Sequence, residues 1–143
     1  MDVVPGISSC VAVPELEGVP LICRGVNESF WVLTGTTVAG KLSEDIRIAV
    51  QSTATIVVLM GIRKIELISQ IFCNAGKGNL PAMVVQNGSH CDSKMVIGQA
   101  KNIAQKVKEE KIGTPGIIVF GEVVGLHPSF DKKPIRLNSA LKF

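Results

Sequence analysis

Three short turns hold the residues of this sequence with the clearest chemical potential. Gly6-Ile7-Ser8-Ser9 precedes a helical pattern, while Met60-Gly61 and Asn87-Gly88 each follow an apolar run typical of a strand. Glycine lets a ligand approach the backbone closely, and small hydroxyl side chains can hydrogen-bond to it. In an open α/β sheet, ligands bind beyond the carboxyl ends of the strands, near helix N-termini. The three turns therefore predict one cleft for a small, partly apolar cofactor.

The sequence contains none of the common catalytic motifs. The Walker loop, the Rossmann glycine motif and the nucleophile elbow are all missing. His90 and His127 have no evident partner, so we interpret them as solvated loop histidines. Arg24 follows a loop, where contact with an anionic substrate and simple solvation explain an arginine about equally well. Glu44 and Asp45 are better explained by the dipole of the helix that they begin than by acid–base chemistry.

The composition describes a chain with a large apolar interior and few charges. Of its 143 residues, 46% are hydrophobic and 19% are charged, and the mean hydropathy is +0.36. This balance suits a buried sheet covered by helices, or an apolar face that meets a partner. A net charge of +3 with 4% aromatic residues argues against nucleic-acid binding. No apolar run approaches the roughly 20 residues of a membrane span, so no membrane partner is expected.

Cysteine spacing bears on metal binding and on location. Cys10, Cys23, Cys73 and Cys91 are far apart, without a Cys-x-x-Cys pair or paired histidines. The pattern argues against a metal site and against a disulfide scaffold. The first ten residues also lack the basic start and apolar core of a secretory signal. We therefore expect free thiols and a cytoplasmic protein.

Apolar runs alternate with helical patterns along the chain. The expected strands are 29–36, 53–61, 81–88 and 116–126, the last being one strand or two joined at Gly121. The expected helices are 7–17, 43–50, 62–75 and 93–111. This alternation predicts an α/β fold with a mixed, mostly parallel sheet of about four or five strands and helices on both faces.

Individual residues predict where the helices begin, bend and end. Ser8 or Ser9 is expected to cap the first helix and Pro14 to kink or end it. Ser43 is the expected cap of the second helix, and Gly76 the expected end of the third. The helix over 93–111 is expected to face the core with Val96, Ala100, Ile103, Ala104 and Val107.

The start of the chain raises a question about domain organisation. Val3-Val4 reads as the end of a buried strand and Pro5-Gly6 as a turn, so the chain begins halfway through a strand–turn–helix unit. Residues 1–126 are expected to form one α/β domain. Residues 127–143 are expected to form a loose polar tail.

Five segments follow one another from about Val3 to about Leu126: VVPGISS, GVPLICRGVNESFWVLTG, TIVVLMG, PAMVVQNGS and GIIVFGEVVGL. In this order they resemble the uroporphyrinogen-III C-methyltransferases of the tetrapyrrole methylase superfamily. Members of this family have two α/β domains, and the Val-Val-Pro-Gly-Ile segment lies at the crossing between them. The resemblance thus implies that the chain is the C-terminal half, without the N-terminal domain that carries a Gly-rich loop and a Gly-Gly-Asp turn.

The resemblance also implies a function. Family members methylate uroporphyrinogen III with S-adenosyl-L-methionine, giving precorrin-2 on the way to sirohaem and cobalamin, and they form homodimers. The cofactor would lie in the cleft that faces the N-terminal domain. Ser8 and Ser9 match the Thr-Ala pair that contacts it, Met60 the methionine of a Tyr-Met-Gly turn, and Gly88 the glycine of a Glu-Asn-Gly turn.

Departures from the family pattern limit what the resemblance assigns. Ser8-Ser9 replaces Thr-Ala, Leu59 stands where tyrosine is common, and the TGTT segment lacks the histidine of a usual Thr-Gly-His. The acid–base residues proposed for the family lie in the other domain, so the resemblance assigns no catalytic residue to this chain. Two alternatives stay open: a non-catalytic remnant or binding module of the same fold, and a sister methylase acting on a corrin intermediate or on diphthine.

Overall fold

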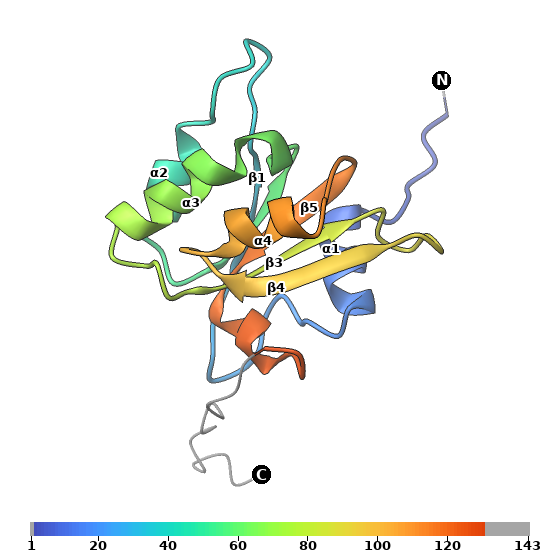
Figure 1. The fold of residues 1–143 in the computed structure, drawn as a ribbon. Helices are drawn as coiled ribbons and strands as arrows, with labels where there is room; N and C mark the ends of the chain where they lie inside the picture. The colour runs from blue at the N-terminus through green and yellow to red at the C-terminus, as the bar shows by residue number, and fades with distance from the viewer. Residues whose placement is uncertain (1, 131–143) are drawn as a thin grey trace, which may run out of the picture.

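The computed structural model describes residues 2–130 and builds them around a five-stranded sheet (Figure 1). The strands are β1 (Phe30–Thr34), β2 (Thr55–Leu59), β3 (Pro81–Gln86), β4 (Lys94–Gln99) and β5 (Gly116–Phe120). The helices are α1 (Ser9–Leu16), α2 (Asp45–Ala49), α3 (Ile65–Asn74) and α4 (Ile103–Glu109), with 3₁₀ helices η1 (Ile62–Lys64) and η2 (Glu122–Leu126). Of the expected tail, residues 131–143 lie outside the described residues.

The sheet is mixed, as the sequence predicts, but the expectation of mostly parallel pairing is wrong. The strand order is β1-β2-β5-β3-β4. β1 pairs parallel with β2, whereas β5 is antiparallel to both β2 and β3, and β4 is antiparallel to β3. Because β5 stands between β2 and β3, the strands β1, β2 and β3 still point the same way. Their carboxyl ends therefore lie at the same end of the sheet.

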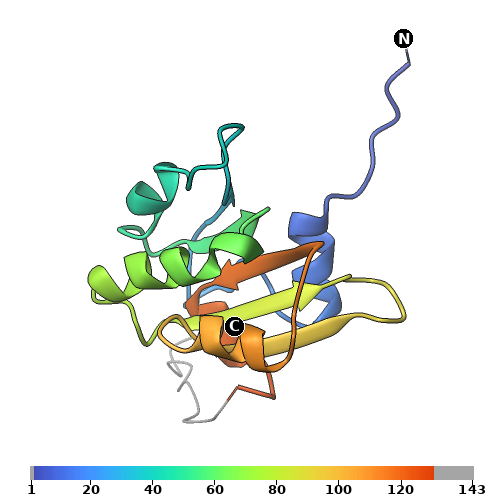
Figure 2. The same ribbon diagram turned by 45° about the horizontal axis from the view of Figure 1, so that its top comes forward.

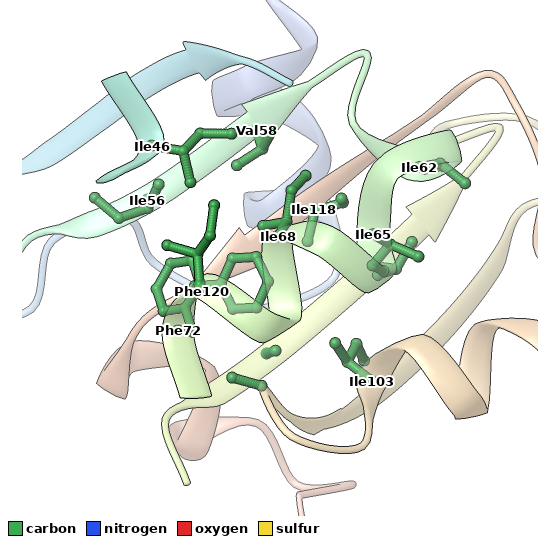
Figure 3. Packing of buried hydrophobic residues seen from close by; sticks show 14 of the residues in the cluster. Ile46, Ile56, Val58, Ile62, Ile65, Ile68, Phe72, Ile103, Ile118 and Phe120 are labelled. Atoms are coloured by element: carbon green, nitrogen blue, oxygen red, sulfur yellow. The ribbon is translucent and has the colours of Figure 1, made fainter. Parts of the chain in front are cut away.

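Helices cover both faces of the sheet, as expected. α2, α3 and α4 pack on one face, while α1, η2 and the loop after α1 pack on the other (Figures 1 and 2). Successive residues of β2 alternate between the two sides, so Ile56 and Val58 join the cluster under α3 and Val57 joins the opposite one. In the α3 cluster, the ring of Phe72 stacks on that of Phe120 with centroids 4.1 Å apart (Figure 3).

The expected helix over 93–111 is wrong in its first half. Residues 94–99 form β4, which pairs along its whole length with β3, and α4 begins only at Ile103. Val96 of β4 and Ile103 and Val107 of α4 are buried in the same apolar cluster. The spacing that suggested one helical stripe therefore arises from a strand and a helix that cover the same core.

Two further boundaries differ from the sequence-based expectation. β5 ends at Phe120 and η2 follows, so 116–126 is neither one strand nor two. A side chain at Gly121 would come within 2.9 Å of Thr55 Oγ1, which shows how tightly the chain turns there. Ser43 is buried and is not the cap of α2, because the capping position belongs to Glu44 and no side chain caps the helix.

The ends of α1 and α3 follow the sequence more closely. Ser8 occupies the capping position of α1, and Pro14 lies inside the helix, which continues to Leu16. α3 ends as expected before Gly76, whose φ is +76°. The amides of Gly76 and Lys77 donate back to the last turn of α3, which satisfies two of its carbonyl groups.

Candidate functional site

The three turns singled out in the sequence meet at the end of the sheet where β2 and β3 finish. With the start of α1 and of β5 they form an open cleft of about 480 Å³, here called the strand-end cleft. Its lining consists of Ser9, Val13, Leu59, Met60, Val85, Asn87, Gly88, His90, Pro115, Gly116 and Ile117. Three of the four predicted site residues, Ser9, Met60 and Gly88, are therefore brought together. A space of this volume is typical of small-molecule sites.

Ser8, the fourth predicted residue, does not line the strand-end cleft. Its Oγ lies 2.9 Å from Sγ of Cys10, and its hydroxyl makes no capping hydrogen bond to α1. Ser9 is the first residue of α1, and both serines are exposed. Of the two hydroxyl groups, only that of Ser9 belongs to a residue of the cleft wall.

Met60 has a backbone conformation that is unusual for a residue with a side chain. Its φ is +54°, in the left-handed region, which costs a non-glycine residue about 1–2 kcal/mol. The side chain gains little packing in return, since it is 68% exposed. A strained and exposed methionine at the mouth of a cleft favours a role in ligand contact over a role in the core.

Hydrogen bonds between the ends of β1 and β2 hold this turn in place. Thr36 Oγ1 donates to the carbonyl oxygen of Met60 at 2.9 Å, and the amide of Gly35 donates to the carbonyl of Leu59 at 2.6 Å. The segments that follow β1 and β2 run so close together that a Cβ on Gly35 would overlap the backbone of Gly61. The segment after β1 therefore holds the backbone of Met60 in place at the mouth of the strand-end cleft.

The Asn87–Gly88 turn is fixed in a different way. Asn87 has a φ of +50°, its amide donates to the carbonyl of Pro115 at 3.0 Å, and its Nδ2 donates to Asp92 Oδ2 at 2.8 Å. A Cβ on Gly88 would lie 2.5 and 2.6 Å from the two methyl carbons of Val13 in α1. The glycine thus lets α1 approach the turn, and this contact closes one side of the cleft.

The walls of the strand-end cleft are mainly apolar. Val13, Val85 and Ile117 are buried residues of the core that show an edge to the cleft, while the polar groups come from Ser9, Asn87, His90 and the backbone. Such a lining suits an apolar ring system with a few polar atoms held by directed hydrogen bonds. Ser9 and His90 share the lining, but no hydrogen bond joins their side chains within residues 2–130, so the hydroxyl is not activated as a nucleophile.

Sequence reasoning missed two parts of this wall. His90 lines the cleft although it is exposed, whereas the sequence suggested only a solvated loop residue. Pro115 and Gly116 were missed because they precede a strand, and ligands were expected only where strands end. β5 runs antiparallel to its neighbours, so its start lies beside the ends of β2 and β3.

Arg24 lies at the other end of the sheet. Its loop is tied to the start of β2, because Nδ2 of buried Asn27 donates to Thr55 Oγ1 at 2.9 Å and Oδ1 of Asn27 accepts from the amide of Cys23 at 2.9 Å. Leu59, at the far end of the same strand, is the residue that lines the strand-end cleft. Arg24 is exposed and does not line that cleft.

Clustered metal ligands and membrane-spanning helices are both absent from residues 2–130. That part of the chain contains no group of three or more His, Cys, Asp or Glu residues placed to hold a metal ion. It also contains no helix with the length and apolar character required to cross a membrane.

Comparison with known proteins gives a consistent result. Residues 1–104 match the model of the tetrapyrrole (corrin/porphyrin) methylases. The chain is 35% identical over 127 residues to a uroporphyrinogen-III C-methyltransferase of Methanocaldococcus jannaschii, covering 87% of this chain and 52% of that protein. It is 33% identical over 129 residues to an S-adenosyl-L-methionine-dependent uroporphyrinogen III methyltransferase of Methanosarcina barkeri, covering 88% and 51%.

A solved structure shares the fold. Uroporphyrin-III C-methyltransferase of Thermus thermophilus, complexed with S-adenosylhomocysteine, superposes with a TM-score of 0.70 at 27% identity, over 87% of this chain and 54% of that one. The chain thus spans about half the length of the relatives that it matches.

Proposed function

Because the chain belongs to the tetrapyrrole methylase family, we propose that the strand-end cleft is one wall of an S-adenosyl-L-methionine site in a uroporphyrinogen-III C-methyltransferase. The observation that supports this most is the meeting of Ser9, Met60 and Gly88 in one cleft. Each of them matches a cofactor-contacting position of the family, and they come from segments far apart in the sequence.

The chemistry of the cleft fits this cofactor. When bound, S-adenosylmethionine supplies a methyl group on a positively charged sulfur, which an electron-rich pyrrole carbon can accept. The apolar surfaces of Val13, Val85 and Ile117 suit the adenosine part, and the hydroxyl of Ser9 and the side chain of Asn87 offer polar partners. The role of this half is to bind and orient the cofactor, and we assign no proton transfer to its residues.

We further propose that a second α/β domain, joined to residues 1–126 or supplied by another chain, forms the opposite wall. Residues 2–8 support this, because Val3, Val4 and Ile7 are extended and 84–89% exposed, and the segment projects away from the sheet (Figure 2). Apolar side chains on an extended segment gain stability when another domain covers them.

The first test is calorimetric titration of the 143-residue chain with S-adenosylhomocysteine. With one wall only, roughly half the contacts are missing, and each loss of about 1.4 kcal/mol weakens binding tenfold. The cofactor must also be ordered against an open surface. We expect weak or undetectable binding by the chain alone and restored binding when the first domain of the family is added in cis or in trans. Micromolar binding by the isolated chain would disprove the two-wall proposal.

Substitutions in the restored protein test the site itself. Met60→Asp should weaken S-adenosylhomocysteine binding because it places a charge in the cleft wall, and Gly88→Phe because its side chain would displace Val13, which lines the same cleft. Arg47→Gln is the matched control, since Arg47 is an exposed residue of α2 outside the cleft. If all three variants bound S-adenosylhomocysteine equally well, the strand-end cleft would not be the cofactor site. Binding without methylation of uroporphyrinogen III would favour a non-catalytic binding module of the same fold.

We also propose a homodimer and a cytoplasmic location. Exposed apolar side chains on β1, an edge strand of the described sheet, support self-association, since Trp31 and Val32 are 39% and 40% exposed. A tetrapyrrole substrate and free thiols at four cysteines fit a reducing compartment. Analytical ultracentrifugation that shows only a monomer at micromolar concentration would contradict the dimer.

A further inference from the structure

A second cleft adjoins the strand-end cleft across Met60. It has a volume of about 560 Å³ and lies between the segment after β1, the start of η1 and the residues before β5. Met60, Pro115 and Gly116 line both clefts. A molecule in the second cleft is therefore separated from a molecule in the first by these shared residues alone.

The second cleft is suited to an amphipathic ligand. Its apolar surface comes from Val38, Met60, Ile62 and Pro115. Thr37 and Thr114 are exposed residues of the same lining, and neither hydroxyl has a hydrogen-bond partner within residues 2–130. An apolar ring can therefore rest on this surface while polar substituents reach the two hydroxyl groups.

Arg63 is the charged residue among the described residues that line this second cleft. The carboxylate of Glu66, one turn further along the helix, pairs with Lys108 of α4 instead. The other ion pair among residues 2–130 joins Arg47 and Glu44, so Arg63 has no carboxylate partner in the described part of the chain. Its guanidinium group is exposed at the cleft and free to bind an anion.

We propose that Arg63 binds a carboxylate side chain of the tetrapyrrole substrate in this second cleft, here called the Arg63 cleft. The inference rests on the function proposed above. Uroporphyrinogen III carries acetate and propionate groups around an apolar macrocycle, which matches an apolar surface with one cation and two hydroxyl groups. A guanidinium group holds a carboxylate through two parallel hydrogen bonds, which fixes orientation as well as adding affinity. Arg63 therefore selects which edge of the macrocycle lies beside Met60 and the cofactor.

The test uses the 143-residue chain and uroporphyrin III, the stable oxidised form of the macrocycle, in a ¹⁵N NMR titration that detects weak binding. We expect shifts at the amides of Thr37, Arg63 and Thr114, and a dissociation constant that rises about tenfold in Arg63→Gln. Arg47→Gln removes the same charge from an exposed arginine outside the cleft and should leave the constant unchanged. Coproporphyrin III has methyl groups in place of the acetates, so it should bind more weakly.

The outcomes separate this inference from the proposed function. An equal loss in Arg63→Gln and Arg47→Gln, or no binding of uroporphyrin III by the chain, overturns the role of Arg63. S-adenosylhomocysteine binding by the restored two-domain protein reports on the cofactor site alone. If that binding is intact while Arg63→Gln leaves the affinity for uroporphyrin III unchanged, only the proposed role of Arg63 is wrong. If uroporphyrin III depends on Arg63 while the cofactor does not bind, only the proposed cofactor site fails.

Discussion

Gly88 has two possible reasons to be a glycine, and a pair of substitutions separates them. Its missing side chain makes room for Val13 of α1, and it also borders the strand-end cleft. In Gly88→Ala the new methyl group would lie 2.5 and 2.6 Å from the methyl carbons of Val13, about 1 Å closer than favourable contact allows. Overpacking of this kind costs about 1–3 kcal/mol of unfolding free energy.

Val13→Ala removes the two methyl groups that the new side chain would strike. Val13 is 6% exposed, so this change alone costs about 2 kcal/mol through lost burial and a small cavity. In the double variant the two closest contacts are gone, the Cβ of residue 13 at 3.1 Å has to move by only a few tenths of an ångström, and the methyl group introduced by Gly88→Ala fills part of the space. The double variant should therefore be no less stable than Val13→Ala, which gives a coupling of about 1–3 kcal/mol.

Urea unfolding followed by circular dichroism measures the four free energies of this cycle. Additivity within about 0.5 kcal/mol would refute the contact between Gly88 and α1 as the source of the cost. S-adenosylhomocysteine binding by the same variants, in the two-domain protein, then addresses the cleft. If Gly88 is needed only for packing against α1, the double variant binds S-adenosylhomocysteine normally. If the cofactor needs a residue without a side chain at position 88, the double variant is stable but binds S-adenosylhomocysteine weakly.

Two further predictions concern buried polar groups. Ser69 Oγ on α3 is buried without a hydrogen-bond partner within residues 2–130, so Ser69→Ala should raise the unfolding free energy by about 1 kcal/mol, and a loss in urea unfolding would contradict this. Ser52→Ala is its control and should lower stability, since Ser52 Oγ donates to the carbonyl of Ala49. Asn27→Ala should cost about 2–4 kcal/mol, because Nδ2 of Asn27 shares its two hydrogens among the carbonyls of Leu21 and Ser29 and the hydroxyl of Thr55, and its Oδ1 accepts from an amide. Faster amide exchange at Cys23 would accompany that loss, and a cost below about 1 kcal/mol would contradict it.

The sequence predicts secondary structure correctly where the local pattern fits only a strand or only a helix. β2 and β3 are runs of consecutive apolar residues that include adjacent valines, and α3 repeats isoleucine at helical spacing. The segment 94–99 is ambiguous, because its short apolar run fits a strand and a helix that continues into α4 equally well. It forms a strand because it pairs with β3, which lies earlier in the sequence. No local pattern contains that information.

The candidate site shows the same division. Ser9, Met60 and Gly88 could be found because they adjoin strand ends and turns, which local residues specify. Pro115 could not, because its place in the cleft depends on β5 running antiparallel between β2 and β3. His90 lies in the hairpin that joins β3 to β4, and the helix expected over 93–111 hid that hairpin. Arg63 belongs to a cleft that exists only once η1, the segment after β1 and the start of β5 have come together.

The central position of β5 has a consequence for how the chain folds during synthesis. β2 and β3 each pair with β5 and not with each other, although both precede it by many residues. The sheet therefore stays in two unconnected pieces, β1-β2 and β3-β4, until residues 116–120 have left the ribosome. During that interval the valines and isoleucines of β2 and β3 lie at open strand edges, which is the kind of surface that chaperones bind and that aggregates grow from. Among residues 2–130, the last strand to be made is the one that completes the sheet.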